Sequence, residues 1–357
     1  MKPLPLIALA DDFSGATEIA GVAHAAGLPV LLTRNRKITL PEAGGILVID
    51  TDTRRKTAPE AAQTHHHLAQ QLQGKASRFY KKTDSVLRGN ILDELHTLLK
   101  ELPYDQVLFC PANPARKRHI HRGKYSIAGI PLHKTEFGQD PHFPATTDDV
   151  DHLLQSRWST TTTPFWHVPD VASEEDLEIT AQRISETTLP AGASPFFEAF
   201  LKVSGLYAPT HKTIPKSNSQ TTLLLSGSFS EVSRQTAAEF QENGWPVTEI
   251  HPDTPIPKKL ETPPISMLKI TGQPLPNPQL LLSQLASTLT QYPLPDHLLI
   301  EGGDTAATIL EKFNWHTFSI LHQWEPGITT IQPQANNAPI LTIKPGSYPW
   351  PQHLFPH

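Results

Sequence analysis

The sequence contains only one cysteine, Cys110, so no disulfide can form within the chain. It has no apolar run that approaches the roughly 18 residues of a membrane span. No hydrophobic signal segment separates Met1 from the first predicted strand. The formal net charge of −5 argues against the basic field that draws a protein to nucleic acid or anionic membranes. These absences predict a cytoplasmic protein that binds neither membrane nor nucleic acid, with Cys110 as a buried structural thiol.

The chain has 357 residues, of which 38% are hydrophobic, so it is long enough for two domains. Its 35 prolines outnumber its 19 glycines and mark stiff connections between periodic apolar segments. The stretch 208–219 is rich in breakers and has no periodicity, which is typical of a linker. We therefore expect domains at residues 1–208 and 219–357.

Segments typical of strands alternate with segments typical of helices in both halves. This alternation predicts the α/β class, with two α/β domains that each have a mostly parallel sheet flanked by helices. The expected strands are 4–9, 29–32, 45–49, 77–81, 106–110, 221–225, 246–250, 297–300, 317–321 and 339–343. The expected helices are 16–26, 59–72, 87–99, 173–186, 194–201, 230–242, 280–292 and 305–313.

Two consecutive carboxylates, Asp11 and Asp12, follow the first predicted strand and precede a predicted helix. The carboxyl ends of parallel strands are where open α/β sheets bind ligands. An acidic side chain can cap the helix, but capping explains only one of the two. The other is left to bind hydroxyl groups or a metal.

Two further loops of the first half also follow predicted strands. One contains Arg54, and the residues 80–90 form the other. A parallel sheet brings both loops to the same edge as the two aspartates. A guanidinium suits a carboxylate, and Asp or Ser suits alcohols, so the three loops predict a site for a small polar acid, with a salt-bridged rim as the alternative. The second loop carries Lys82, Thr83, Asp84, Ser85 and Arg88.

In the second half, glycine- and serine-rich loops follow three predicted strands. Glycine lets backbone amides approach an anion, and a helix N-terminus adds its positive dipole end, so these loops are candidates to cradle phosphate. Tight turns also use glycine for steric reasons, and no Walker A motif occurs. The loops contain Ser228, then Gly302, Gly303, Asp304 and Thr305, and finally Gly346.

Three other features carry weaker signals. The run 65–67 of three histidines lies on a predicted helix and favours a solvated face over a metal site. The basic run 116–122 suits a local anionic ligand or an exposed loop. His133 stands beside Lys, Thr and Glu and is a weaker candidate for binding substrate or acting as a base.

These motifs resemble the four-carbon acid sugar kinases, which phosphorylate tetronates with ATP. The resemblance follows the family's order over most of the chain and is most specific in the first half. It rests on Ala10-Asp11-Asp12-Phe13-Ser14-Gly15-Ala16-Thr17, Asp50-Thr51-Asp52-Thr53-Arg54, Lys81 to Asn90, Cys110 to Arg116, Gly129 to Phe137 with Asp140-Pro141, Ser226-Gly227-Ser228 with Gln235, and Gly302 to Ala306.

The resemblance implies a sugar-acid-binding domain at 1–208, a nucleotide-binding domain at 219–357 and an active site in the interdomain cleft. It implies an ATP- and Mg2+-dependent transferase of carbohydrate metabolism that phosphorylates threonate, erythronate or 3-oxo-tetronate. Asp11 or Asp12 is the expected catalytic base. The implied substrate-binding residues are Asp11, Asp12, Arg54, Lys82, Thr83, Asp84, Ser85 and Arg88, and the implied ATP-binding residues are Ser228, Gly302, Gly303, Asp304, Thr305 and Gly346.

The last loop departs from the family pattern. Where the family has a glycine-rich turn after Lys-Ser, this chain has Lys344-Pro345-Gly346-Ser347, and proline removes a backbone donor. The departure motivates an alternative, a non-catalytic sugar-acid-binding or sensor protein with a degenerate nucleotide domain. A metal-dependent hydrolase or lyase that uses the opening aspartates is a third hypothesis. The sequence leaves open a homodimer, the particular tetronate and the hydroxyl group attacked.

Overall fold

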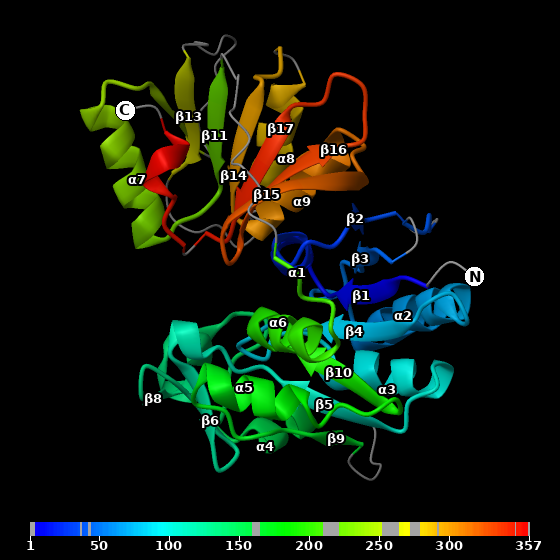
Figure 1. Ribbon diagram of the computed structural model, residues 1–357. Helices are drawn as coiled ribbons and strands as arrows, with labels where there is room; N and C mark the ends of the chain where they lie inside the picture. Colours follow the sequence, from blue (N-terminus) through cyan, green and yellow to red (C-terminus); the bar gives the residue numbers. More distant parts are fainter. Residues whose placement is uncertain are drawn as a thin grey trace. The chain divides into compact units, whose positions relative to one another are not determined.

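The computed structural model describes residues 4–35, 38–41, 44–158, 165–209, 221–251, 264–271, 279–290, 293–346 and 348–355. The chain divides into two compact units, Met1–Thr210 and His211–His357. The breaker-rich stretch 208–219 spans this division, and its residues from 210 onward lie outside the described part. Both units have the predicted α/β architecture, with helices packed on a largely parallel sheet (Figure 1).

The N-terminal unit is built on a parallel sheet with the strand order β2-β3-β1-β4-β10-β5-β9. Its central strands are short apolar runs that are buried on both faces, as parallel strands between helices are. The strands are β1 (Leu6–Ala10), β2 (Val30–Thr33), β3 (Ile46–Asp50), β4 (Arg78–Lys82), β5 (Gln106–Cys110), β9 (Trp166–His167) and β10 (Thr188–Gly192).

Helices of this unit pack on one another in two groups. One group places α1 against α6 and α6 against α5, and the other places α2 against α3. Tyr80 on β4 is fully buried and contacts three phenylalanine rings of α6, which fixes that helix to the sheet. The helices are α1 (Phe13–Ala25), α2 (Ala58–Leu72), α3 (Ile91–Glu101), α4 (Val150–Ser156), α5 (Glu174–Ala181) and α6 (Ser194–Val203).

Strand β10 corrects the expectation that 106–110 ends the first series of strands. It inserts between β4 and β5, and its sequence Thr-Leu-Pro-Ala-Gly has low strand propensity, which is why the pattern gave no signal. Its last residue, Gly192, has φ 149°, and a Cβ there would lie 2.0 Å from the Cys110 carbonyl oxygen. Cys110 is buried as predicted, and burial raises the pKa of its thiol to about 12.

A small antiparallel sheet follows β5. It consists of β6 (Arg118–His121), β7 (Lys124–Ile127) and β8 (Ile130–Pro131). The basic run 116–122 therefore contains the first strand of a hairpin, β6, and the residues on either side of it. Arg122 and Gly123, both at positive φ, form the turn of the hairpin.

The C-terminal unit has the strand order β12-β13-β11-β14-β17-β16-β15. Its first five strands are parallel, whereas β16 is antiparallel to both of its neighbours. The sequence analysis missed β13 and β16. The strands are β11 (Thr222–Ser226), β12 (Val247–Ile250), β13 (Ile265–Ile270), β14 (His297–Glu301), β15 (Thr317–Glu325), β16 (Ile328–Pro333) and β17 (Ile340–Lys344), and the helices are α7 (Glu231–Glu242), α8 (Gln279–Leu289) and α9 (Gly303–Lys312).

Two helix predictions need correction. The helix expected over 173–186 ends at Ala181, so α5 is shorter than its polar composition indicated. The helix expected over 87–99 begins only at Ile91, because the preceding residues form a tight loop. Among the described residues, no helix combines the length and the apolar character that crossing a membrane requires.

Candidate functional site

The two aspartates after β1 have different roles in the fold. Asp12 is the N-cap of α1, and its Oδ1 accepts a hydrogen bond of 2.9 Å from the Gly15 amide. Asp11 does not cap the helix, and its side chain is only 2% exposed. A charge buried to that degree requires a partner of opposite sign. Capping thus accounts for one of the two acids, as the sequence predicted.

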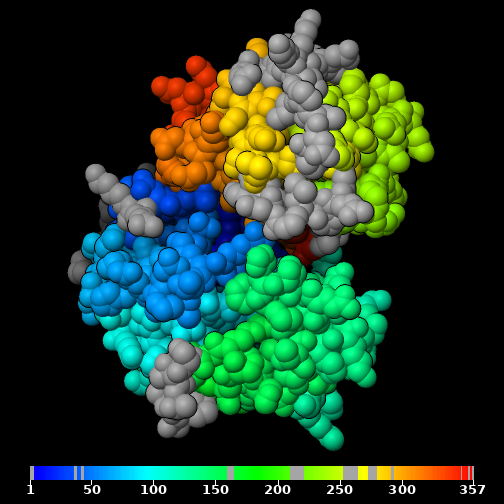
Figure 2. Space-filling view, turned by 180° about the vertical axis from the view of Figure 1, so that it is seen from behind, coloured from blue at the N-terminus to red at the C-terminus, as the bar shows by residue number. Residues whose placement is uncertain are grey.

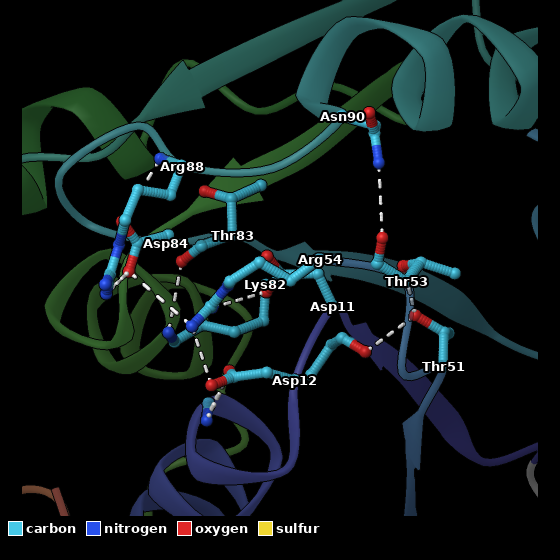
Figure 3. A network of polar contacts seen from close by, with 12 residues as sticks. Asp11, Asp12, Thr51, Thr53, Arg54, Lys82, Thr83, Asp84, Arg88 and Asn90 are labelled. Atoms are coloured by element: carbon cyan, nitrogen blue, oxygen red, sulfur yellow. Dashed lines mark hydrogen bonds and ion pairs between the residues drawn. The ribbon is translucent and has the colours of Figure 1, made fainter. Parts of the chain in front are cut away.

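Arg54, in the loop after β3, is that partner (Figure 3). Its Nε and Nη2 donate to the two oxygens of Asp11 at 2.7 and 2.8 Å, and its Nη1 donates to Asp12 at 2.6 Å. The same Nη1 lies 3.7 Å from Asp84 Oδ1. One guanidinium therefore joins the ends of three adjacent parallel strands, β3, β1 and β4. The fork geometry of arginine permits the bidentate contact, which lysine cannot make.

The loop after β4 is shaped around Asp84. This carboxylate accepts hydrogen bonds from the Val86 and Arg88 amides and from the Arg88 guanidinium, whose Nε and Nη2 lie 2.9 Å from its oxygens. Leu87 and Gly89 both have positive φ, which delays the start of α3. A Cβ on Gly89 would lie 3.2 Å from Asp11 Oδ2, so glycine allows this loop to approach the aspartate closely.

The remaining predicted residues of this loop lie beside the same cluster. Lys82 is buried, and its Nζ pairs with Glu18 Oε2 of α1 at 3.2 Å. The Thr83 hydroxyl is buried and has no hydrogen-bond partner in the described part of the chain. Ser85 accepts a hydrogen bond from Arg118. The structure thus brings Asp11, Asp12, Arg54, Lys82, Thr83, Asp84, Ser85 and Arg88 to one edge of the sheet.

The pKa values of Asp11 and Asp12 are shifted in opposite directions. Burial favours the protonated form of Asp11, but Arg54 outweighs it and lowers the pKa of this carboxyl. Burial raises the pKa of Asp12 overall, since the adjacent negative Asp11 adds to the effect and Arg54 opposes it only in part. For Asp84, Arg88 and Arg54 outweigh burial and lower the pKa. Asp12 is also the more open of the aspartate pair, with 24% of its side chain exposed.

A second buried ionic cluster, which the sequence analysis missed, lies within the same unit. Glu94 of α3 pairs with Lys81 at 2.8 Å and accepts a hydrogen bond of 2.5 Å from the Thr53 hydroxyl. The expectation that 65–67 forms a solvated face is wrong for His65, which is fully buried with its Nε2 3.7 Å from Glu94. Burial lowers the pKa of His65. A clue was available, because Glu94 falls on the apolar face of α3 with Ile91 and Leu95.

The neighbouring histidines are accessible. His66 is partly exposed and its Nδ1 lies 2.7 Å from Glu101, and His67 is exposed on the same helix, α2, at the surface of the unit (Figure 2). His133 is half-buried, with Nδ1 3.9 Å from Asp148. The described residues contain no group of three or more His, Cys, Asp or Glu side chains that could hold a metal ion.

In the C-terminal unit, the three predicted loops converge at the ends of the neighbouring strands β11, β14 and β17. Ser228 and Ser230 donate to the Gly346 carbonyl at 3.4 and 2.7 Å. A Cβ on Gly346 would lie 2.7 Å from Ser228 Oγ, and one on Gly227 would lie 2.4 Å from Thr305 Oγ1. Only glycine fits this close packing of loops.

Gly302, at φ 101°, precedes α9 and donates its amide to the Lys344 carbonyl. Gly303 and Asp304 begin that helix. The side chain of Lys344 is fully buried, and its Nζ lies 3.1 Å from Glu301 Oε1. Lys269 Nζ lies 2.6 Å from Ser233 Oγ beneath the Ser228 loop. Burial lowers the pKa of both lysines.

Residues 6–176 match the model of a family described as the sugar-binding N-terminal domain. D-threonate kinase of Salmonella typhimurium is 30% identical over 156 residues, which cover 42% of this chain and 36% of the relative. 3-Oxo-tetronate kinase of Pseudomonas fluorescens is 31% identical over 169 residues, covering 44% and 38%. The chain thus spans less than two fifths of these relatives. 3-Oxo-tetronate kinase of Haemophilus influenzae is 21% identical over 401 residues, covering 95% and 96%.

Solved structures share the fold along nearly the whole chain. A Salmonella typhimurium protein, provisionally described as a tRNA synthase, superposes with a TM-score of 0.79 at 19% identity and covers 96% of each chain. A Haemophilus influenzae protein from a family of unknown function gives 0.70 at 20% identity, covering 95% and 96%. A Bordetella bronchiseptica protein, described as a domain-swapped dimer with bound citrate, gives 0.50 at 18% identity, covering 96% and 95%.

The N-terminal unit is therefore similar to a sugar-binding domain. These matches confirm the resemblance of the sequence motifs to the four-carbon acid sugar kinases.

The first prediction concerns Arg54. Replacing it with methionine leaves the buried Asp11 without a counter-charge, so we expect the free energy of unfolding to fall by about 3–5 kcal/mol. Urea denaturation measures this. Arg54→Met combined with Asp11→Asn removes the unpaired charge as well and is expected to recover part of the loss. Arg122→Met, on an exposed turn, is the control and is expected to change stability by less than about 0.5 kcal/mol. Equal stability of Arg54→Met and the control would contradict the prediction.

A second prediction concerns Asp50, at the end of β3. Its side chain pairs with Arg34 at 2.9 Å. Burial, opposed by Arg34 and reinforced by Asp52, raises the pKa of Asp50 to about 7 from its ordinary 3.8. Between pH 4 and 7 the unfolded chain loses this proton while the folded protein retains it. The stability that the group supplies is therefore lost as the pH rises through 7.

Asp50→Asn removes this titration. We expect the free energy of unfolding of the variant, relative to that of the wild type, to increase from pH 5 to pH 8. Chemical denaturation at both pH values measures the change. A constant difference between the two proteins at pH 5 and pH 8 would rule out the raised pKa.

Proposed function

We propose that the protein is an ATP-dependent kinase that phosphorylates a hydroxyl group of a four-carbon sugar acid. The observation that carries this proposal is the ionic cluster of Asp11, Asp12, Arg54 and Asp84. It lies at the carboxyl ends of parallel strands, where open α/β sheets bind ligands, in a unit that is similar to a sugar-binding domain. The names of the relatives support the substrate class, since they are D-threonate and 3-oxo-tetronate kinases. Threonate, erythronate and 3-oxo-tetronate are the substrates proposed here.

We assign the role of catalytic base to Asp12. A general base works best when its pKa approaches the operating pH. The raised pKa and partial exposure of Asp12 meet this condition. Asp11, in contrast, is buried and bound by Arg54 through both carboxylate oxygens, and its pKa is lowered. Asp11 is then a positioning residue. Lys82, Thr83, Asp84, Ser85 and Arg88 are proposed to bind the substrate together with Arg54.

The C-terminal unit is proposed to bind ATP through Ser228, Gly302, Gly303, Asp304, Thr305 and Gly346. The close packing of the glycine loops and the N-terminus of α9 support this role, because exposed amides at a helix start attract phosphate. Mg2+ is proposed to accompany the nucleotide. It is commonly held by phosphates and one or two carboxylates, so the lack of a three-ligand cluster in the described residues is compatible with it, and Asp304 is the exposed carboxylate beside these loops.

In the proposed reaction Asp12 accepts the proton of the attacked hydroxyl. The sugar oxygen forms a bond to the terminal phosphorus of ATP, the bond to the bridging oxygen breaks, and ADP leaves with that electron pair. Mg2+, when bound, neutralises charge on the phosphate oxygens. Arg54 keeps Asp12 in place through its 2.6 Å hydrogen bond.

A non-catalytic sugar-acid-binding protein is the second candidate. The observation that favours it is Lys344, which is fully buried against Glu301 and so does not extend toward a phosphate. The proline that follows removes an amide donor from the same loop. We further propose that the protein is cytoplasmic and acts on small molecules. A homodimer is proposed by analogy with the Bordetella protein.

ADP release from ATP and Mg2+ with a panel of tetronates tests the proposal. We expect release that depends on one of the sugar acids, with a new phosphate ester detected by mass spectrometry. Calorimetric binding of a tetronate with no turnover would replace the kinase proposal with the binding-protein one. Absence of both binding and turnover would overturn both.

Asp12→Asn tests the base. Asparagine caps a helix as well as aspartate does, so the fold is expected to survive. The kcat is expected to fall by about 10²–10⁴-fold, with little change in tetronate affinity. Asp105→Asn, at an exposed site just before β5, is the control with unchanged kcat. Near-normal turnover by Asp12→Asn would remove this residue from the mechanism.

A further inference from the structure

The cations around the ionic cluster differ in how far their charge is neutralised. Arg54 is paired with Asp11 and Asp12, and Lys82 is paired with Glu18. Arg88 is paired with Asp84 and lies 3.7 Å from Asp140. Each of these groups therefore already has a carboxylate of the protein beside it.

Arg118 differs from these three cations. It lies at the start of β6, and its Nη1 donates to Ser85 Oγ, directly beside Asp84 in sequence. Within the part of the chain that the structure describes, no carboxylate lies within ion-pair distance of Arg118. Its Nε is buried and has no hydrogen-bond partner there either. A half-buried guanidinium with an unmatched charge is costly unless a ligand supplies the missing anion.

The surroundings hold Arg118 in a defined place. Its guanidinium lies 5.8 Å from the centre of the Phe137 ring, and the Arg88 guanidinium lies 6.0 Å from the same ring. Tyr125, which is fully buried, donates its hydroxyl to the Ser85 carbonyl at 2.5 Å. Ser85 is thus held through both its backbone and its side chain. The rigid mounting preorganises Arg118 for binding.

We propose that Arg118 binds the carboxylate of the sugar acid and so selects acids over neutral polyols. This inference rests on the proposed function and adds a specificity-determining residue to it. A guanidinium is the side chain best matched to a carboxylate, and the partial burial of Arg118 strengthens the interaction by excluding water. The hydroxyls of the substrate are then left to the aspartates of the cluster.

The test compares a tetronate with the tetritol of the same chain length, which has the hydroxyls but no carboxylate. Calorimetry without nucleotide measures binding of each to the wild type, Arg118→Met, Arg118→Lys and the exposed control Arg122→Met. We expect Arg118→Met to bind the tetronate about 10- to 100-fold more weakly and the tetritol with unchanged affinity. Lysine keeps the charge without the fork and is expected to be intermediate.

Steady-state kinetics supply a second readout. The KM for the tetronate is expected to rise by a similar factor in Arg118→Met, while the KM for ATP stays constant. A merely structural role would weaken acid and polyol together. If Arg118→Met does not fold, as judged by thermal unfolding, Arg118→Lys carries the test through its own loss of selectivity.

The outcomes separate this inference from the proposed function. The role of Arg118 alone would be overturned if the wild type phosphorylates a tetronate and the folded Arg118 variants keep the wild-type ratio of tetronate affinity to tetritol affinity. Tetronate binding without turnover would overturn the kinase proposal. The ratio of the tetronate and tetritol affinities from calorimetry would then still decide the role of Arg118. A wild type that neither binds nor phosphorylates a tetronate would overturn both.

Discussion

The candidate site depends on one guanidinium. Arg54 follows β3 and contacts Asp11 and Asp12 after β1 and Asp84 after β4, so it joins the ends of three adjacent strands. Without a shared cation, three acids at one edge of a sheet would repel one another and resist burial. With it, their pKa values separate: Asp11 and Asp84 are lowered while Asp12 is raised. The same contact thus holds the loops together and makes neighbouring carboxylates chemically unequal.

A second ionic contact, between Glu94 and Lys81, stabilises the loop that carries Arg54. Glu94 joins Lys81 at the end of β4 to Thr53, which directly precedes Arg54. Asn90 donates to the Thr53 and Lys56 carbonyls, so the start of α3 is tied to the same loop. The backbone of Arg54 is therefore fixed before its side chain makes any contact. Such support accounts for the narrow geometry of the cluster, since the position of a long side chain is only as defined as the backbone that carries it.

The sequence predicted the strand ends and most residues of the cluster, because short apolar runs followed by charged loops define both. It did not predict β10, whose proline and glycine oppose a strand assignment, nor the three-stranded hairpin sheet that carries Arg118. It also predicted a solvated face for 65–67, whereas His65 is buried and His66 is partly exposed. The pairing of particular ions could not be predicted, because spacing along the chain does not specify which guanidinium reaches which carboxylate.

The close contact between Gly192 and Cys110 has a practical consequence. The thiol lies at the end of β5, beside β10 and near the loops of the cluster, and its raised pKa keeps it protonated. Because Cys110 is buried, a thiol reagent can modify it only when the sheet of this unit opens. The chain has no other cysteine, so all labelling reports on this position. The rate of labelling therefore measures how often the structure around Cys110 opens locally. No introduced probe is needed to follow how a bound ligand slows it.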